Sequence, residues 1–131
     1  MRERRYQCQE CGALIAVVPR GVLRGRHYSA GAIGLALVLF GVVGLPLAEV
    51  RARVSPWPVV GATASSTWLT ARRWVRAIRR QRLFASMRPT PPGWSARQVA
   101  ERAAMGLEAQ APPTILGEIT ARVFAGATLA A

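Results

Sequence analysis

Twenty-one consecutive residues without a charge, Tyr28 to Ala48, constrain the fold of this 131-residue chain more than any other feature. From Ile33 to Val43 only apolar residues and glycine occur, so a helix there is apolar on every side. Such a helix is stable either inside a protein core or across a bilayer, which about 20 residues can span. The stretch therefore allows two different proteins, one with a buried helix and one with a membrane span.

Capping residues divide this stretch into two short helices. Ser29 is a good N-cap for a helix from Ala30 to about Val43, and Gly44 suits the position after its end. Pro46 suits the first position of a second helix, which carries three apolar residues on one face: Leu47, Val50 and Val54. We predict two buried helices. The alternative is a small membrane protein with one span over residues 28–48 and a basic helix on the lipid surface.

Residues 65–82 predict an amphipathic helix with a strongly basic face. At about 100° per residue, apolar side chains gather on one face: Trp68, Ala71, Trp74, Val75 and Ile78. Arginines gather on the other face, with Leu69 among them: Arg72, Arg73, Arg76, Arg79 and Arg80. Hydroxyl residues at the start, Ser65, Ser66 and Thr67, are N-cap candidates. This helix suits a DNA groove, and the plainer alternative is a core helix with a solvated basic face.

Charge and composition favour a folded protein that attracts polyanions. The formal net charge is +12, every basic residue other than His27 is arginine, and half of the residues are apolar. All six acidic residues are glutamates at scattered positions, and no nucleophile elbow, phosphate-binding glycine loop or H-E-x-x-H pair occurs. We therefore expect no enzyme and no small-molecule substrate, and a cytoplasmic location.

Cys8 and Cys11 form a C-x-x-C-G knuckle with Gly12, and residues 13–18 follow as a β-prone apolar run. Together they predict one hairpin of a zinc ribbon. A structural zinc takes four ligands, and His27 is the one further histidine or cysteine in the chain. The missing ligands would lie upstream of this start or come from a second chain, unless the site is degenerate or the pair stays reduced and unmetallated.

The overall prediction is a mainly α protein with four parts. Residues 1–21 form a truncated zinc-ribbon-like hairpin, and residues 22–84 form a three-helix helix-turn-helix domain. A Pro-rich linker over 85–93 precedes a helical C-terminal extension over 94–131. In that extension Ser95 and Gln98 form a capping-box pattern, and Thr114 is the expected cap of a last helix that carries Ile115, Ile119 and Val123. The extension could support a homodimer.

Several motifs together resemble a family of small bacterial transposase-related proteins. They are R-R-Y-Q-C-Q-E-C-G-A from Arg4, R-H-Y-S from Arg26, G-L-P-L-A-E-V from Gly44, and S-S-T-W-L-T-A-R-R-W-V-R from Ser65. Members of that family pair a zinc ribbon with a homeodomain-like helix-turn-helix. The likeness covers residues 4–82. The chain departs from the family pattern because the first cysteine pair is absent and because the segment before the basic helix is longer.

The resemblance and the charge pattern together imply binding to double-stranded DNA at a mobile element, without catalysis. Arginines on the basic helix would contact phosphates and guanine edges, and hydroxyl residues near its start would contact backbone or bases. The expected DNA-binding residues are Ser66, Thr67, Thr70, Arg72, Arg73, Arg76, Arg79 and Arg80. Cys8 and Cys11 are the expected zinc ligands. A decayed transposase fragment without function is a further alternative, motivated by the missing half of the ribbon.

Overall fold

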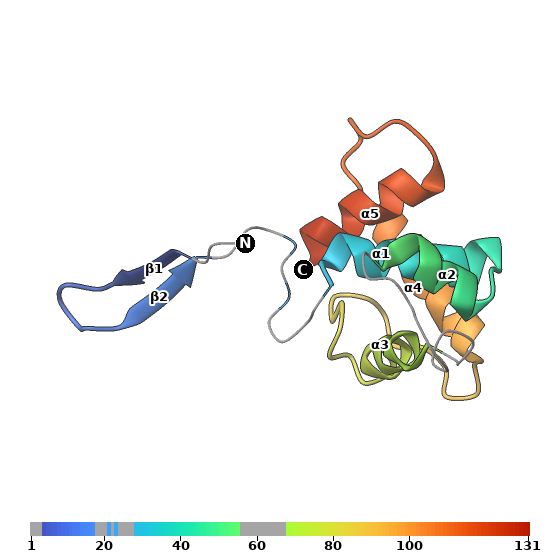
Figure 1. Ribbon diagram of the computed structural model, residues 1–131, viewed down its shortest axis with the longest axis horizontal. Helices are drawn as coiled ribbons and strands as arrows, with labels where there is room; N and C mark the ends of the chain where they lie inside the picture. Colours follow the sequence, from blue (N-terminus) through green and yellow to red (C-terminus); the bar gives the residue numbers. More distant parts are fainter. Residues whose placement is uncertain (1–3, 18–20, 22, 24–27, 56–67) are drawn as a thin grey trace.

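The computed structural model describes residues 4–17, 21, 23, 28–55 and 68–131, and these residues are mainly helical, as the sequence predicts (Figure 1). Strands β1 (Arg4–Gln7) and β2 (Leu14–Val17) come first. Helix α1 (Ala30–Val38) continues into the π-helical turn η1 (Leu39–Val43), and α2 (Leu47–Val54) follows. The remaining helices are α3 (Leu69–Arg79), α4 (Ala96–Ala109) and α5 (Ile119–Ala130).

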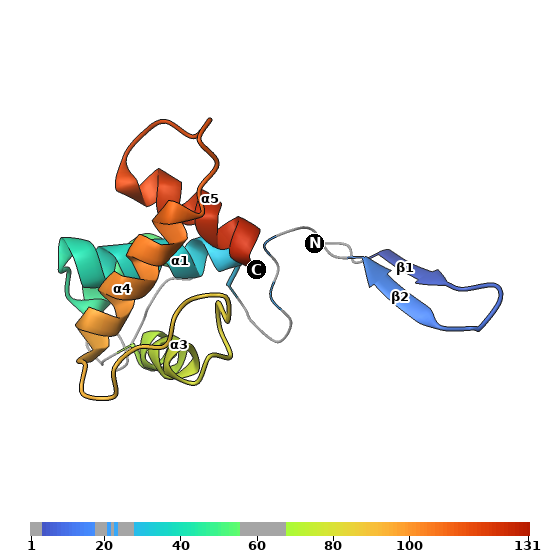
Figure 2. The same ribbon diagram turned by 180° about the vertical axis from the view of Figure 1, so that it is seen from behind.

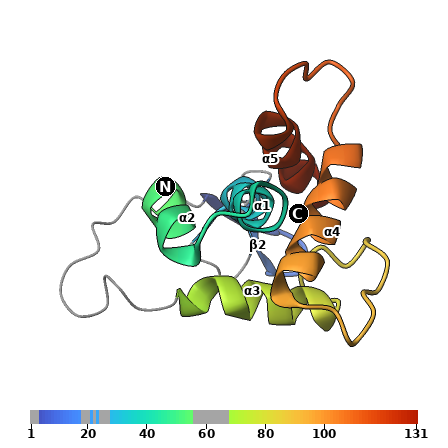
Figure 3. The ribbon, with the colours of Figure 1, turned by 90° about the vertical axis from the view of Figure 1, so that its right-hand side faces the viewer.

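Helix α1 lies at the centre of the helical part, which explains its uncharged sequence. Figure 3 shows α1 end-on, with α2, α3, α4 and α5 placed around it, and it contacts all four. Ile33 and Val38 are fully buried, and Leu37 is nearly so. A helix that meets neighbours on every side must be apolar on every side. Most of residues 30–39 are therefore core residues, whereas Val42 and Val43 are exposed, at 38% and 51%.

The predicted caps are confirmed for α1 and nearly so for α2. The Ser29 Oγ accepts a hydrogen bond from the Ala32 N–H at 3.1 Å, and Gly44 ends η1 in the left-handed conformation with φ +83°. Pro46 was expected at the first position of α2, but it is the N-cap, and the helix begins one residue later at Leu47. The uncharged stretch is thus divided at residues 44–46. Among the described residues, no helix is both long and apolar enough to cross a membrane.

Helices α4 and α5 belong to the same core as α1 and α3. Their buried residues Val99, Ala103, Leu107, Val123 and Ala127 form one hydrophobic cluster with Ile33 of α1 and Trp74 of α3. Glycines allow the helices to approach closely. A Cβ at Gly34 would lie 2.7 Å from the Cβ of Ala127, and one at Gly126 would overlap the carbonyl oxygen of Leu107. The segment after the Pro-rich stretch therefore supplies a large share of the apolar packing.

Helix α3 is shorter than the predicted helix over residues 65–82. Its N-cap is Trp68, which makes no side-chain capping bond, and the expected caps Ser65, Ser66 and Thr67 lie outside the described residues. At the other end Gln81 takes a left-handed conformation with φ +53°. The N–H of Arg82 donates to the carbonyl of Ala77 at 2.9 Å, which closes the helix and excludes Arg82 from it.

Helix α5 begins later than expected, so the prediction that Thr114 caps it is wrong. Its N-cap is Glu118, and Ile115 lies before the helix in a tight turn, where its N–H donates to the Pro112 carbonyl at 3.0 Å. Gly117 has φ +154°, a conformation that residues with a side chain rarely adopt, and this interrupts any helix that begins at Thr114. The capping box of Ser95 and Gln98 at the start of α4 is confirmed.

Candidate nucleic-acid interface

Helix α3 separates its apolar and basic faces as the sequence pattern predicts. Ala71, Trp74, Val75 and Ile78 are all buried. The five arginines of the opposite face, Arg72, Arg73, Arg76, Arg79 and Arg80, are all exposed, and Leu69 is 59% exposed beside them. The helix is therefore held by its apolar side and carries its guanidinium groups at the surface.

Three aromatic rings fix the start of α3 against the start of α1. The rings of Tyr28, Trp68 and Trp74 meet edge to face, with centroids 5.2 to 5.9 Å apart. The Tyr28 hydroxyl donates a hydrogen bond to the Ser55 Oγ at 3.2 Å, so the end of α2 joins the same cluster. Sequence reasoning placed Trp68 and Trp74 on the apolar face but missed Tyr28. Its position directly before the Ser29 cap was the available signal.

Within the described residues, no acidic side chain forms an ion pair with the arginines of α3. From Val50 to Ala100 the sequence has no aspartate and no glutamate. Arg72, Arg73 and Arg76 form no ion pair with any residue that the structure describes, and Arg79 donates to the main-chain carbonyl of Trp94 at 2.6 Å. Among the residues that the structure describes, no carboxylate therefore neutralises Arg72, Arg73 or Arg76.

A groove runs between α3 and the first turn of α4. Arg72, Arg76 and Arg79 line it, with Val75 and Ala96 as its apolar part, and its volume is about 390 Å³. The bond from Arg79 to Trp94 holds one guanidinium at the wall of this groove. Three guanidiniums around one open groove provide donors in the fork geometry that matches phosphate oxygens.

The arginine spacing on α3 works against the stability of the helix. Arg76 lies three or four positions from four other arginines: Arg72, Arg73, Arg79 and Arg80. Like charges at these spacings destabilise a helix by roughly 0.2–0.5 kcal/mol per pair. Arg76 and Arg79 lie in the last turn, where positive charge stabilises the helix dipole, but Arg72 and Arg73 do not. Helix stability therefore does not account for the whole basic face.

Of the other residues expected to contact DNA, the structure describes two and leaves two outside the described residues. Thr70 lies half-buried in the first turn of α3, and Arg80 is the C-cap residue of the same helix. Ser66 and Thr67 fall outside the described residues, as does His27. The described part of the predicted DNA-binding set is thus Thr70 with the five arginines.

The cysteine knuckle lies in the turn between β1 and β2. The strands pair antiparallel, with Arg4 opposite Val17 and Gln7 opposite Leu14. The N–H of Gly12 donates to the Cys8 carbonyl at 2.9 Å, and Gly12 has φ +71°, which glycine adopts without strain. Cys8 and Cys11 are free thiols, and no group of three metal-ligating residues occurs within the described ranges. These residues thus supply two of the four ligands that structural zinc takes.

Main-chain N–H groups lower the pKa of the Cys8 thiol. The N–H of Cys11 contributes most, the N–H of Glu10 adds to it, and the Cys11 side chain contributes a further hydrogen bond. In a Cys11→Ser variant, which keeps the main-chain donors, we expect alkylation of Cys8 by iodoacetamide to accelerate at a lower pH than alkylation of an unstructured cysteine peptide. Rates measured across a pH series check this, and superimposable profiles would contradict it.

Comparison with known proteins finds no matching family model, no matching curated protein and no matching solved structure. What the chain does is therefore inferred from its own surface, and above all from the basic face of α3.

Proposed function

We propose that this protein binds double-stranded DNA through the basic face of α3. The observation that carries the proposal is the set of five exposed arginines on one face of a helix whose opposite face is buried. Phosphate contacts by arginine supply most of the affinity of such surfaces, and an α-helix fits the major groove. In this proposal Arg72, Arg76 and Arg79 hold phosphates at the groove beside α4, and Arg73 and Arg80 extend the contact along the duplex.

The packing of α3 favours DNA over a lipid surface as the anionic partner. A helix that lies in a membrane interface inserts its apolar face among the acyl chains. In α3 that face is committed to the core, since Trp74 is 2% exposed and Ile78 is 6% exposed. Leu69 is the one large apolar side chain of α3 that is exposed. Binding through α3 would therefore rest on charge, and guanidiniums presented on one helix face suit the regular phosphates of a duplex.

The order of the helices supports a helix-turn-helix-like use of α3. Helix α1 with η1, the turn at Gly44, the short helix α2 and then the basic helix α3 follow the chain order of that motif. The packing also departs from it, because α3 packs more against α4 than against α2. In the proposal, α3 therefore enters the major groove, and α4 stabilises α3 by packing against it.

A relationship to transposases remains a proposal that rests on the motif likeness over residues 4–82. Strand transfer needs acidic residues that hold two metal ions, and the six glutamates of this chain are widely spaced in sequence. We therefore propose a binding role without catalysis. Zinc at Cys8 and Cys11 would require ligands beyond the described residues.

Direct competition between two anionic partners tests the proposed function. We expect the full chain to bind a fluorescent duplex of about 20 base pairs with micromolar or better affinity at physiological salt. Vesicles of phosphatidylcholine with a quarter phosphatidylserine should not displace the duplex from the protein when lipid and duplex offer the same amount of accessible negative charge. Anisotropy measures the first result and vesicle sedimentation the second. Strong vesicle binding without duplex binding would reverse the assignment.

A further inference from the structure

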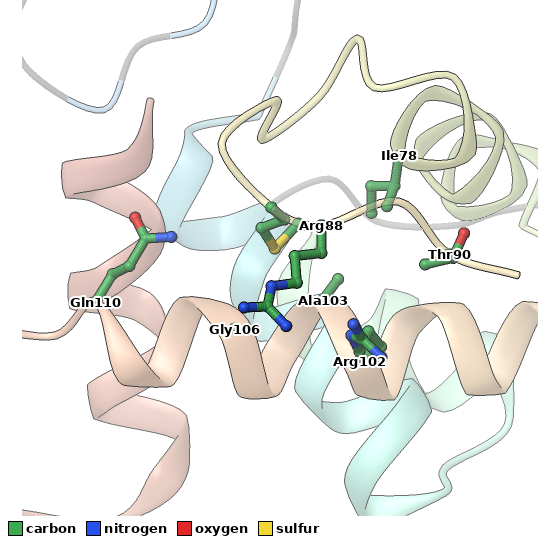
Figure 4. A pocket seen from close by; sticks show the side chains of 8 residues that line it. Ile78, Arg88, Thr90, Arg102, Ala103, Gly106 and Gln110 are labelled. Atoms are coloured by element: carbon green, nitrogen blue, oxygen red, sulfur yellow. The ribbon is translucent and has the colours of Figure 1, made fainter.

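A second basic cavity lies behind α3, away from the arginines proposed to contact DNA. It is formed by the end of α3, the loop after it and the middle of α4, and its volume is about 190 Å³ (Figure 4). Four lining residues are small or apolar: Ile78, Met87, Ala103 and Gly106. The other four carry polar side chains: Arg88, Thr90, Arg102 and Gln110. The cavity is thus an apolar space with a polar margin.

Every polar group at this margin can donate a hydrogen bond, and none is acidic. Arg88 and Arg102 are permanent cations, and Arg102 is placed by Trp94, with its guanidinium carbon 5.6 Å from the ring centroid. The Thr90 Oγ1 has almost no accessible surface, so it is not open to the cavity, and the two guanidiniums are the charged donors there. Two guanidiniums at one cavity repel each other. An anion with acceptor oxygens would relieve this repulsion.

We propose that this cavity binds a small organic carboxylate with an apolar body. The carboxylate would lie between Arg88 and Arg102, since the guanidinium fork matches two carboxylate oxygens. The apolar body would contact Ile78, Met87 and Ala103. An apolar cavity of about 150 Å³ can hold benzene, so the space here suits one aromatic ring or a short branched chain. This ligand site is independent of the proposed DNA contact.

Gly106 leaves space in the cavity because it has no side chain. Gly106 lines the cavity, and a Cβ at this position would lie 3.2 Å from the Met87 sulfur, so alanine would take space from the cavity and push only a flexible side chain. Alanine is the better residue in the middle of a helix such as α4. A Gly106→Ala variant should therefore fold at least as well as the native chain while holding the ligand less tightly.

Sodium benzoate and neutral benzyl alcohol form a matched pair of probes. Isothermal titration calorimetry on the full chain without DNA should show benzoate binding at least tenfold tighter than benzyl alcohol. Arg88→Gln and Arg102→Gln should each weaken benzoate binding about tenfold or more, which corresponds to about 1.4 kcal/mol. Arg73→Gln removes the same charge from α3 at a position that does not line the cavity, and should leave benzoate affinity unchanged.

Three results would overturn the proposal. They are no saturable benzoate binding up to about 10 mM, equal affinity for benzoate and benzyl alcohol, and equal loss of binding in the Arg73→Gln control. Gly106→Ala provides the check on folding: an unchanged or raised melting temperature together with weaker benzoate binding supports the site, whereas undiminished binding would exclude the cavity as its location.

Discussion

Replacing Arg72, Arg73 and Arg76 together with alanine is expected to lower the affinity for duplex DNA by about 100- to 1,000-fold at 0.1 M salt. Each phosphate contact contributes roughly a factor of ten under these conditions, because counterions are released from the duplex when arginine neutralises a phosphate. All three side chains are exposed and form no ion pair with a described residue, so the fold does not depend on their charge. Anisotropy titration with a labelled duplex measures the loss.

A second triple variant distinguishes DNA contact by the surface of α3 from attraction of DNA by the net charge of the whole protein. Arg53, Arg88 and Arg102 are also exposed but lie on α2, in the loop after α3 and on α4. Their replacement with alanine removes the same three charges, and we expect a loss of tenfold or less, because long-range attraction alone is weakened. Equal losses in the two triple variants would mean that the protein attracts DNA through its overall charge and that α3 is not the contact.

Gly126→Ala is expected to destabilise the protein by about 3 kcal/mol, a large part of the stability of a domain of this size. Gly126 lies in α5, and a Cβ there would overlap the carbonyl oxygen of Leu107 in α4. The obstacle is main chain near the end of a helix, so no flexible side chain can move aside. Helix α5 would have to shift away from α4 and α1 and expose Val123 and Ala127. Thermal unfolding followed by circular dichroism should show a melting temperature lower by roughly 10 °C.

Gly93→Ala is the matched control for this substitution. Nothing lies within 4 Å of a Cβ placed at Gly93, and its backbone conformation is open to other residues. The added methyl should leave stability unchanged or raise it slightly, by restricting the unfolded chain. A Gly126→Ala protein that melts with the native one would show that α5 does not pack on α4 as described.

The sequence predicted the helical elements better than their packing. Local signals were sufficient for the start of α1 at Ser29, the end of η1 at Gly44 and the capping box at Ser95, because each depends on a few neighbouring residues. The all-apolar pattern of α1 could not decide between a core and a bilayer, since both surround a helix with apolar contacts. In the structure α1 contacts four other helices, and its π-helical continuation η1 ends at Val43.

Tertiary features of the site could not be derived from spacing along the chain. The cluster of Tyr28, Trp68 and Trp74 joins residues up to 46 positions apart in sequence. The basic groove needs Ala96 of α4 beside Arg72 and Arg79 of α3, and no periodicity within one helix indicates a neighbouring helix. The face of α3 was predictable because it follows from the helical period alone. The packing that holds this face in place comes from α4, which the sequence analysis had assigned to a C-terminal extension.

The dependence of DNA affinity on salt tests the central proposal most directly. If the five arginines of α3 neutralise phosphates, the logarithm of the association constant should fall linearly with the logarithm of NaCl concentration, with a slope of about −4.5. Loss of Arg72, Arg73 and Arg76 should make that slope shallower by about 2.7, whereas the variant at Arg53, Arg88 and Arg102 should keep it. A flat salt dependence, or a slope that the α3 variant leaves unchanged, would contradict DNA binding by this face.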